Sequence, residues 1–99
     1  MSVKGIDLST FQTNVNWEKV KADGIEFAMV RAGFGNSITQ KDNMFDSHVT
    51  GALKAGIAVG AYWFSYAIST VDAEQEARVF QQVLNPYKGQ IAYPTAFNP

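Results

Sequence analysis

The sequence predicts an α/β protein with a βαβαβαβ order, which makes a parallel sheet equivalent to half of a (β/α)8 barrel. Short apolar runs alternate with segments in which apolar residues recur at helical spacing. The runs begin near positions 4, 26, 58 and 90, so each repeat has about the 22 to 32 residues of one βα unit. A complete barrel needs about 200 to 250 residues. The 99 residues are therefore expected to form a single partial domain, 1–99.

The first βα unit is predicted from an apolar run at 3–8, followed by a helix at 16–22. The helix is expected to stop at Gly24, because glycine readily adopts the left-handed conformation that ends helices. The next run, 25–32, is almost continuously apolar, which is typical of a parallel strand buried on both faces. Residues 33–36 contain two glycines and are expected to end it.

The second half of the chain repeats this pattern. A helix is predicted over 42–55, a strand over 57–67 and a strand over 91–97. Between the two strands, Ser69 is expected to cap the longest helix, which stops before Pro86. The apolar stripes expected to face the core are Phe45, Val49, Ala52 and Leu53 in the first of these helices, and Ala73, Ala77, Phe80 and Leu84 in the second.

This alternation fits either an open doubly wound sheet or part of a closed barrel. Half a barrel has two unpaired strand edges and one uncovered apolar face. We therefore expect self-association as a homo-oligomer, or pairing with a complementing half-barrel chain.

Composition excludes several classes of function. The formal charge of −1 provides no cationic field for a nucleic acid or an anionic membrane, so neither is expected as a partner. The chain has no cysteine and one histidine, which argues against a metal site. No apolar run reaches the length of a membrane span, and the N-terminus has no secretory signal. We expect a protein that is made in the cytoplasm and exported by another route if it acts outside.

Candidate site residues lie where the predicted strands end, because parallel α/β proteins place their chemistry at the carboxyl ends of strands. Asp7 lies within the first apolar strand, where a carboxylate needs a partner or a chemical role. It could instead cap the following loop or pair with Arg31. Arg31 could bind a substrate carboxylate or form an internal ion pair. Asn98 follows the fourth strand.

An aromatic cluster ends the third strand. Tyr62 and Tyr66 are expected to line a cleft, whereas Trp63 and Phe64 are expected to pack internally. His48 is interpreted as a helix-surface residue without a catalytic role. Gly33-Phe34-Gly35 is interpreted as a turn, since the third glycine of a dinucleotide loop is missing, and Ser9, Thr10 and Ser65 have no base within a motif.

Five segments, read together, resemble the N-terminal half of family 25 glycoside hydrolases, the lysozymes and phage endolysins. They are Lys4-Gly5-Ile6-Asp7-Leu8-Ser9, Phe11-Gln12, Asn16-Trp17, the segment FAMVRAG at 27–33 and the segment AGIAVGAYWF at 55–64. The resemblance covers essentially the whole chain in the family's order. It implies half of an irregular (β/α)8 TIM-like barrel, N-acetylmuramidase activity on bacterial peptidoglycan, and no cofactor.

The resemblance also assigns individual residues. Asp7 matches the family's active-site aspartate on strand one, Arg31 its strand-two arginine, and Tyr62 an aromatic residue of its saccharide groove. Trp63 stands where the family commonly has histidine. In the family, an aspartate and, two residues later, a glutamate acid follow strand four. Here Asn98 takes the aspartate position and no glutamate follows.

The isolated chain is therefore expected to be inactive, since glycoside hydrolysis needs both carboxyl groups. Three interpretations remain. The chain is a lysozyme fragment, a non-catalytic glycan-binding or assembly module, or an enzyme completed in trans by a second chain.

Overall fold

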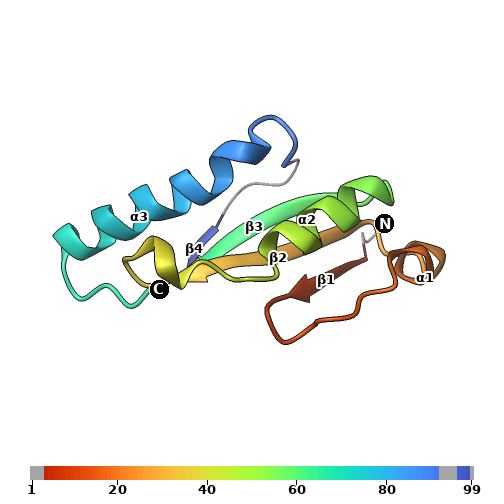
Figure 1. The fold of residues 1–99 in the computed structure, drawn as a ribbon, viewed down its shortest axis with the longest axis horizontal. Helices are drawn as coiled ribbons and strands as arrows, with labels where there is room; N and C mark the ends of the chain where they lie inside the picture. Colours follow the sequence, from red (N-terminus) through yellow and green to blue (C-terminus); the bar gives the residue numbers. More distant parts are fainter. Residues whose placement is uncertain (1–3, 92–95, 99) are drawn as a thin grey trace.

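The computed structural model describes residues 4–91 and 96–98, and for 96–98 it describes the backbone alone. Strands and helices alternate around a parallel sheet with the order β1-β2-β3-β4 (Figure 1), which confirms the predicted βαβαβαβ alternation. The strands are β1 (Gly5–Leu8), β2 (Phe27–Phe34), β3 (Ala58–Phe64) and β4 (Ala96–Asn98). The helices are α1 (Trp17–Ala22), α2 (Phe45–Lys54) and α3 (Thr70–Leu84), with short 3-10 turns η1 (Ile38–Gln40) and η2 (Asn85–Tyr87).

Strand β2 has the predicted length but lies two residues further along the chain, at Phe27–Phe34 instead of 25–32. The ladder to β3 shifts register between Arg31 and Gly33 and then resumes through Phe34, so the expected end at residue 32 is wrong. A β-carbon on Gly33 would lie 2.6 Å from Cζ3 of Trp63, so the absence of a side chain lets the strand pass the indole. The turn expected at 33–36 is reduced to its second half, where Gly35 has a φ of +73°.

Other boundaries shift by a few residues. Helix α2 begins at Phe45 rather than at residue 42, and β3 ends at Phe64 rather than at residue 67. Ser69 caps α3 as predicted, because its side chain accepts a hydrogen bond from the backbone N–H of Asp72. Of the predicted strand at 91–97, residues 92–95 lie outside the described residues, and β4 pairs in parallel with β3.

The core lies between the sheet and one layer of helices. Helix α2 contacts β2 and β3, and α3 contacts β2. Trp63 is fully buried and packs on Phe80 of α3, with 5.6 Å between ring centroids. The remaining buried apolar side chains around them are Leu8, Ala28, Val30, Ala32, Phe45, Val49, Ala52, Ile57, Val59, Ala61, Val79 and Val83.

The predicted stripe of α3 is partly wrong. The buried residues are Glu76, Val79, Phe80 and Val83, whereas Ala77 is exposed and Ala73 and Leu84 are half-buried. The predicted stripe of α2 holds for its first three residues, and Leu53 is half-buried.

The opposite face of the sheet is open. Along β2, Ala28, Val30 and Ala32 are fully buried, but the alternating Phe27, Met29 and Arg31 keep part of their surface exposed. Successive residues of a strand point to opposite faces, so the second set defines a face that the described helices do not cover. We call it the open face. Self-association through this face remains a prediction.

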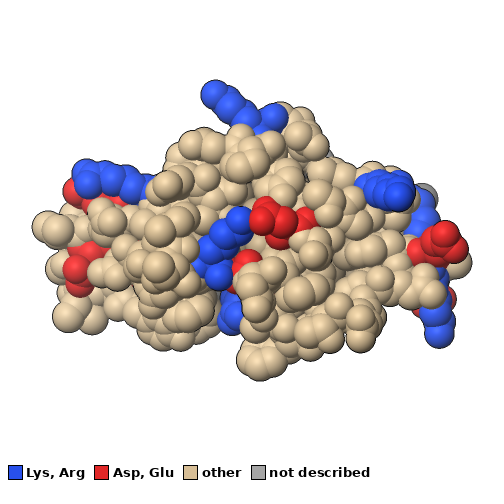
Figure 2. Space-filling view, in the orientation of Figure 1, with Lys and Arg blue, Asp and Glu red and all other residues tan. Residues whose placement is uncertain are grey.

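Charged side chains are dispersed over one face of the molecule. Figure 2 shows Lys and Arg side chains in small groups, several of them beside Asp or Glu and separated by uncharged surface, on the face displayed. Among the described helices, none has the length and apolarity needed to cross a membrane.

A tyrosine beside α2 makes stability sensitive to alkali. Partial burial raises the pKa of Tyr87 to about 12, and the hydrogen bond that it donates to Asp46 and the charge of that carboxylate act in the same direction. The folded state therefore holds a proton that the unfolded chain loses near pH 10. We expect the free energy of unfolding to fall between about pH 10 and 12, with a shallower fall in Tyr87→Phe, as measured by urea denaturation at each pH. An identical slope in both proteins would contradict this assignment.

Candidate functional site

Three of the predicted site residues lie together on the open face, near the carboxyl ends of the strands. Arg31 pairs with Tyr62 across β2 and β3, and Asp7 of β1 pairs with Met29, two residues before Arg31 on the same face. The structure therefore groups Asp7, Arg31 and Tyr62. Asp7 is exposed, so the expectation of a carboxylate buried in the first strand is wrong: the open face leaves it in solvent.

The grouped charges affect the titration of Tyr62. The pKa of Tyr62 is raised above its ordinary value of 10.0, chiefly because its hydroxyl is partly removed from water. The positive charge of Arg31 opposes the shift, and the negative charges of Asp7 and Asp42 reinforce it. Tyr62 therefore remains a neutral hydrogen-bonding phenol at physiological pH.

Tyr66 extends the site beyond the end of β3. Its side chain is 64% exposed, and its ring lies 6.0 Å from that of Phe34 and 5.3 Å from that of Phe64. Phe64 is itself 39% exposed, so the expectation that it packs internally is wrong, whereas Trp63 is buried as predicted. Because Phe34 and Phe64 are paired at the ends of β2 and β3, the three rings form an aromatic ledge at this edge. Asn98 pairs with Phe64 through the backbone of β4.

Arg31 forms an internal ion pair, but not with Asp7. Its Nε donates to Oδ2 of Asp42 over 3.0 Å. The carbon of its guanidinium lies 5.9 Å from the ring centroids of both Phe11 and Phe34, within the range of cation–π attraction. The alternative in which Asp7 pairs with Arg31 is therefore wrong, because Asp42 takes that position.

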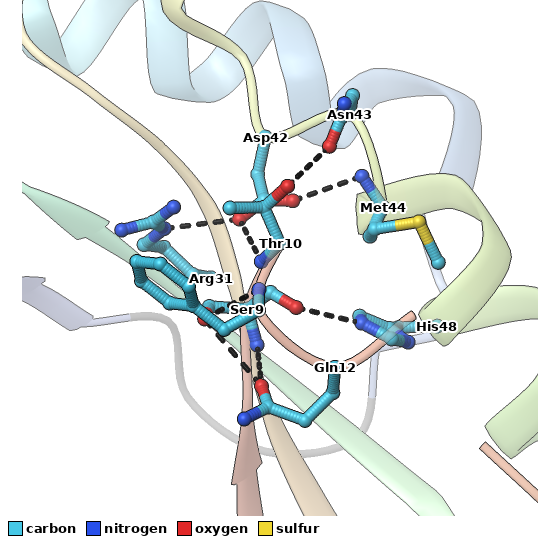
Figure 3. A network of polar contacts seen from close by, with 9 residues as sticks. Ser9, Thr10, Gln12, Arg31, Asp42, Asn43, Met44 and His48 are labelled. Atoms are coloured by element: carbon cyan, nitrogen blue, oxygen red, sulfur yellow. Dashed lines mark hydrogen bonds and ion pairs between the residues drawn. The ribbon is translucent and has the colours of Figure 1, made fainter. Parts of the chain in front are cut away.

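Asp42 is the site residue that the sequence analysis missed (Figure 3). Its side chain is fully buried, and Oδ2 also accepts a hydrogen bond from the backbone N–H of Thr10 over 2.8 Å. Oδ1 accepts from the N–H of Met44 over 2.9 Å. An aspartate that bonds the N–H two residues later makes an Asx turn, a recognisable signal just before a helix. The carboxylate thus ties the loop after β1 to the start of α2.

His48 belongs to the same network and is buried, so the helix-surface interpretation is wrong. Its Nε2 donates to the carbonyl of Ser9 over 2.9 Å, and its ring meets that of Trp17 edge-on. Gln12 closes the loop by accepting a hydrogen bond from the N–H of Ser9 over 2.8 Å. The histidine therefore anchors the loop that carries Phe11.

A second buried carboxylate fixes the loop after β3. Glu76 of α3 accepts a hydrogen bond from the hydroxyl of Ser65 and a second one, over 2.9 Å, from the backbone N–H of Tyr66. The hydroxyl of Ser65 therefore has a structural role. A pocket of about 160 Å³ lies beside this contact, lined by Gly35, Asn36, Gln40, Tyr66, Ala67, Asp72 and Glu76.

Other hollows lie away from the open face. Cavities of about 380 and 420 Å³ adjoin Trp17 and the side of α2, and they share Val15, Gly51 and Lys54. Within the part of the chain that the structure describes, no three histidine or acidic side chains gather as metal ligands would.

The sheet and its helix layer define an α/β protein with a parallel sheet, in which polar and aromatic side chains gather at the carboxyl ends of the strands. The profile of the glycosyl hydrolases family 25 matches residues 6–96. The chain belongs to this family.

Individual relatives support this assignment to the family. The chain is 43% identical to Lysozyme M1 of Streptomyces globisporus over 63 residues, which are 64% of this chain and 21% of that protein. It is 41% identical to a family GH25 lysozyme from Aspergillus fumigatus, with a TM-score of 0.72 over 81% of this chain and 37% of that one. The modular autolysin LytC of Streptococcus pneumoniae, solved with a synthetic peptidoglycan ligand, gives 25% identity and a TM-score of 0.84 over 96% of this chain and 22% of that one. The chain thus spans well under half the length of these relatives.

Proposed function

We propose that this chain is the substrate-groove half of a peptidoglycan-cleaving N-acetylmuramidase, and that the 99 residues bind glycan without hydrolysing it. The observation that carries the proposal is the grouping of Asp7, Arg31 and Tyr62 on the open face of a family 25 fold. The relatives support the substrate class, because they are lysozymes and an autolysin solved in complex with a synthetic peptidoglycan ligand.

In this proposal each residue has a separate role. The Tyr62 ring and the aromatic ledge stack against sugar rings, and Asp7 accepts hydrogen bonds from the hydroxyl or amide groups of the sugar. Asn98 lies at the position of the family's strand-four aspartate but carries no charge. An amide can neither stabilise an oxocarbenium-like centre with a full negative charge nor act as a general acid.

The first experiment tests hydrolysis. Purified peptidoglycan is incubated with the 99-residue chain, and soluble products are analysed by mass spectrometry, with Asp7→Asn as control. We expect no muropeptides from either protein. New reducing-end N-acetylmuramic acid from the wild type alone would show that an assembled or substitute acid exists, and would overturn the proposed lack of activity.

Glycan binding is tested separately by sedimentation with insoluble peptidoglycan. Tyr62→Ala is expected to weaken binding about tenfold, since an aromatic stacking contact contributes up to about 1.5 kcal/mol. Tyr87→Ala is the matched control, because that tyrosine packs beside α2 on the other side of the sheet. Equal binding by wild type and Tyr62→Ala would exclude this groove.

The open face also favours a second candidate, an assembly module completed in trans by another copy or a complementing half. Sedimentation velocity distinguishes it: a dimer whose formation restores hydrolysis supports completion in trans, and a monomer at all concentrations contradicts it. For localisation, we propose synthesis in the cytoplasm and action on the bacterial cell wall after release or export.

A further inference from the structure

We propose that Arg31 recognises a carboxylate of the peptidoglycan substrate and that Asp42 is the positioning residue that orients it. This inference rests on the proposed function and adds the chemical group by which that site would select its ligand. An arginine at the end of a strand can form an internal ion pair or bind a substrate carboxylate. The structure permits both at once, because the two interactions use different nitrogens.

The internal pair occupies one nitrogen of the guanidinium. Arg31 donates to Asp42 through Nε, and neither terminal nitrogen donates a hydrogen bond to a described residue. The Arg31 side chain keeps 20% of its surface exposed, whereas that of Asp42 keeps none. The two terminal nitrogens together present the forked pair of N–H donors that matches the two oxygens of a carboxylate.

The orientation of the guanidinium is fixed from three sides. The Asp42 carboxylate cannot rotate freely, because its two oxygens are also held by the backbone N–H groups of Thr10 and Met44. Phe11 and Phe34 each lie 5.9 Å from the guanidinium carbon. A guanidinium held in this way loses little further conformational entropy when it binds a ligand.

Position on the open face gives this donor pair access to a glycan. Arg31 lies directly across from Tyr62, the proposed stacking residue, and the aromatic ledge begins at Phe34, three residues further along β2. A sugar ring against Tyr62 would therefore bring its substituents to Arg31. The carboxylate of Asp7 lies on the same face, on the neighbouring strand β1.

The ligand chemistry follows from this geometry. Peptidoglycan bears carboxylates on the lactyl group of N-acetylmuramic acid or, where that group is joined to peptide, on the peptide itself. A polymer of N-acetylglucosamine bears none. A forked arginine would therefore select peptidoglycan over a neutral glycan, whichever of the two carboxylates it contacts.

The test measures the affinity of the 99-residue chain for three probes by NMR titration. The probes are the N-acetylglucosaminyl-N-acetylmuramic acid disaccharide, its lactyl methylamide, and the disaccharide tetrapeptide. We expect about tenfold tighter binding of a carboxylated probe than of the methylamide, since charge-assisted forked hydrogen bonds are about twice as strong as neutral ones. A preference for the disaccharide acid identifies the lactyl carboxylate, and a preference for the tetrapeptide alone identifies the peptide carboxylates.

Variants separate orientation from charge. Arg31→Gln is expected to abolish the preference, so that the disaccharide acid and its methylamide bind with equal affinity. Asp42→Asn removes a negative charge beside Arg31. If only net charge matters, this variant binds the carboxylated probe more tightly. If Asp42 orients the guanidinium, the variant binds that probe more weakly. We expect the preference to fall at least threefold. Arg31→Lys retains the positive charge without the fork and is expected to behave likewise, which provides a second test if Asp42→Asn does not fold.

The outcomes are distinguishable. Equal affinity of the wild type for all three probes overturns the carboxylate proposal and leaves glycan binding intact. No binding of any probe overturns the proposed function together with it. A preference that is unchanged or larger in Asp42→Asn overturns the positioning role, and an unchanged preference in Arg31→Lys overturns the forked contact.

Discussion

Replacing Trp63 by alanine is expected to lower the free energy of unfolding by about 3–5 kcal/mol. The indole is fully buried, packs on Phe80, and donates a hydrogen bond from Nε1 to the carbonyl of Gly35 over 2.8 Å. Alanine would leave a cavity between the sheet and α3 and an unpaired carbonyl at the end of β2. Urea denaturation followed by circular dichroism measures the loss.

Trp63→Phe is the matched variant, because it fills most of the volume and removes the hydrogen bond. We expect it to cost less than alanine replacement, and Trp17→Ala, at a half-buried indole, to cost less as well. A loss below about 1 kcal/mol for Trp63→Ala would mean that the layer formed by α3 collapses onto the sheet without the indole.

Replacing Asp42 by alanine is expected to cost about 3 kcal/mol, near the lower limit for breaking a buried ion pair. The expected loss lies at the lower limit because Arg31 keeps part of its surface in water. Alanine would also leave the N–H groups of Thr10 and Met44 without their acceptor. Thermal and urea unfolding measure the effect.

The matched variant is Asp42→Asn, whose amide oxygen can still accept one of these hydrogen bonds. It should therefore lose less stability than Asp42→Ala. Equal losses in the two variants would indicate that the charge, rather than the set of hydrogen bonds, provides the stability. A loss of less than 1 kcal/mol in Asp42→Ala would show that the loop after β1 is held by other contacts.

Much of the fold follows from hydrophobic periodicity. The order of strands and helices and the Ser69 cap could be predicted because each depends on residues close together in sequence. The side of α3 that faces the core could not be predicted in this way. Glu76 has the polarity of a surface residue, and only its contacts with Ser65 and Tyr66, 10 to 11 residues away, show why it is buried.

The candidate site was likewise only partly predictable from the sequence. Asp7, Arg31 and Tyr62 could be placed at strand ends from the sequence, and their common face follows from strand register. The partner of Arg31 could not be predicted, because pattern analysis assigned Asp42 to a helix start. The burial of His48 could not be predicted for a related reason. A histidine beside an apolar stripe looks exposed unless the distant carbonyl that it binds is known.

The hydrogen bonds that hold the loop after β1 also bear on the order in which the chain folds. Thr10 and Asp42 are 32 residues apart, and Ser9 and His48 are 39 apart. Such contacts form only after the long segment between the two residues has closed into a loop, which costs chain entropy. They therefore form slowly compared with a local turn. We expect the Phe11 loop to become ordered after β2 and α2 have assembled, as a late step of folding.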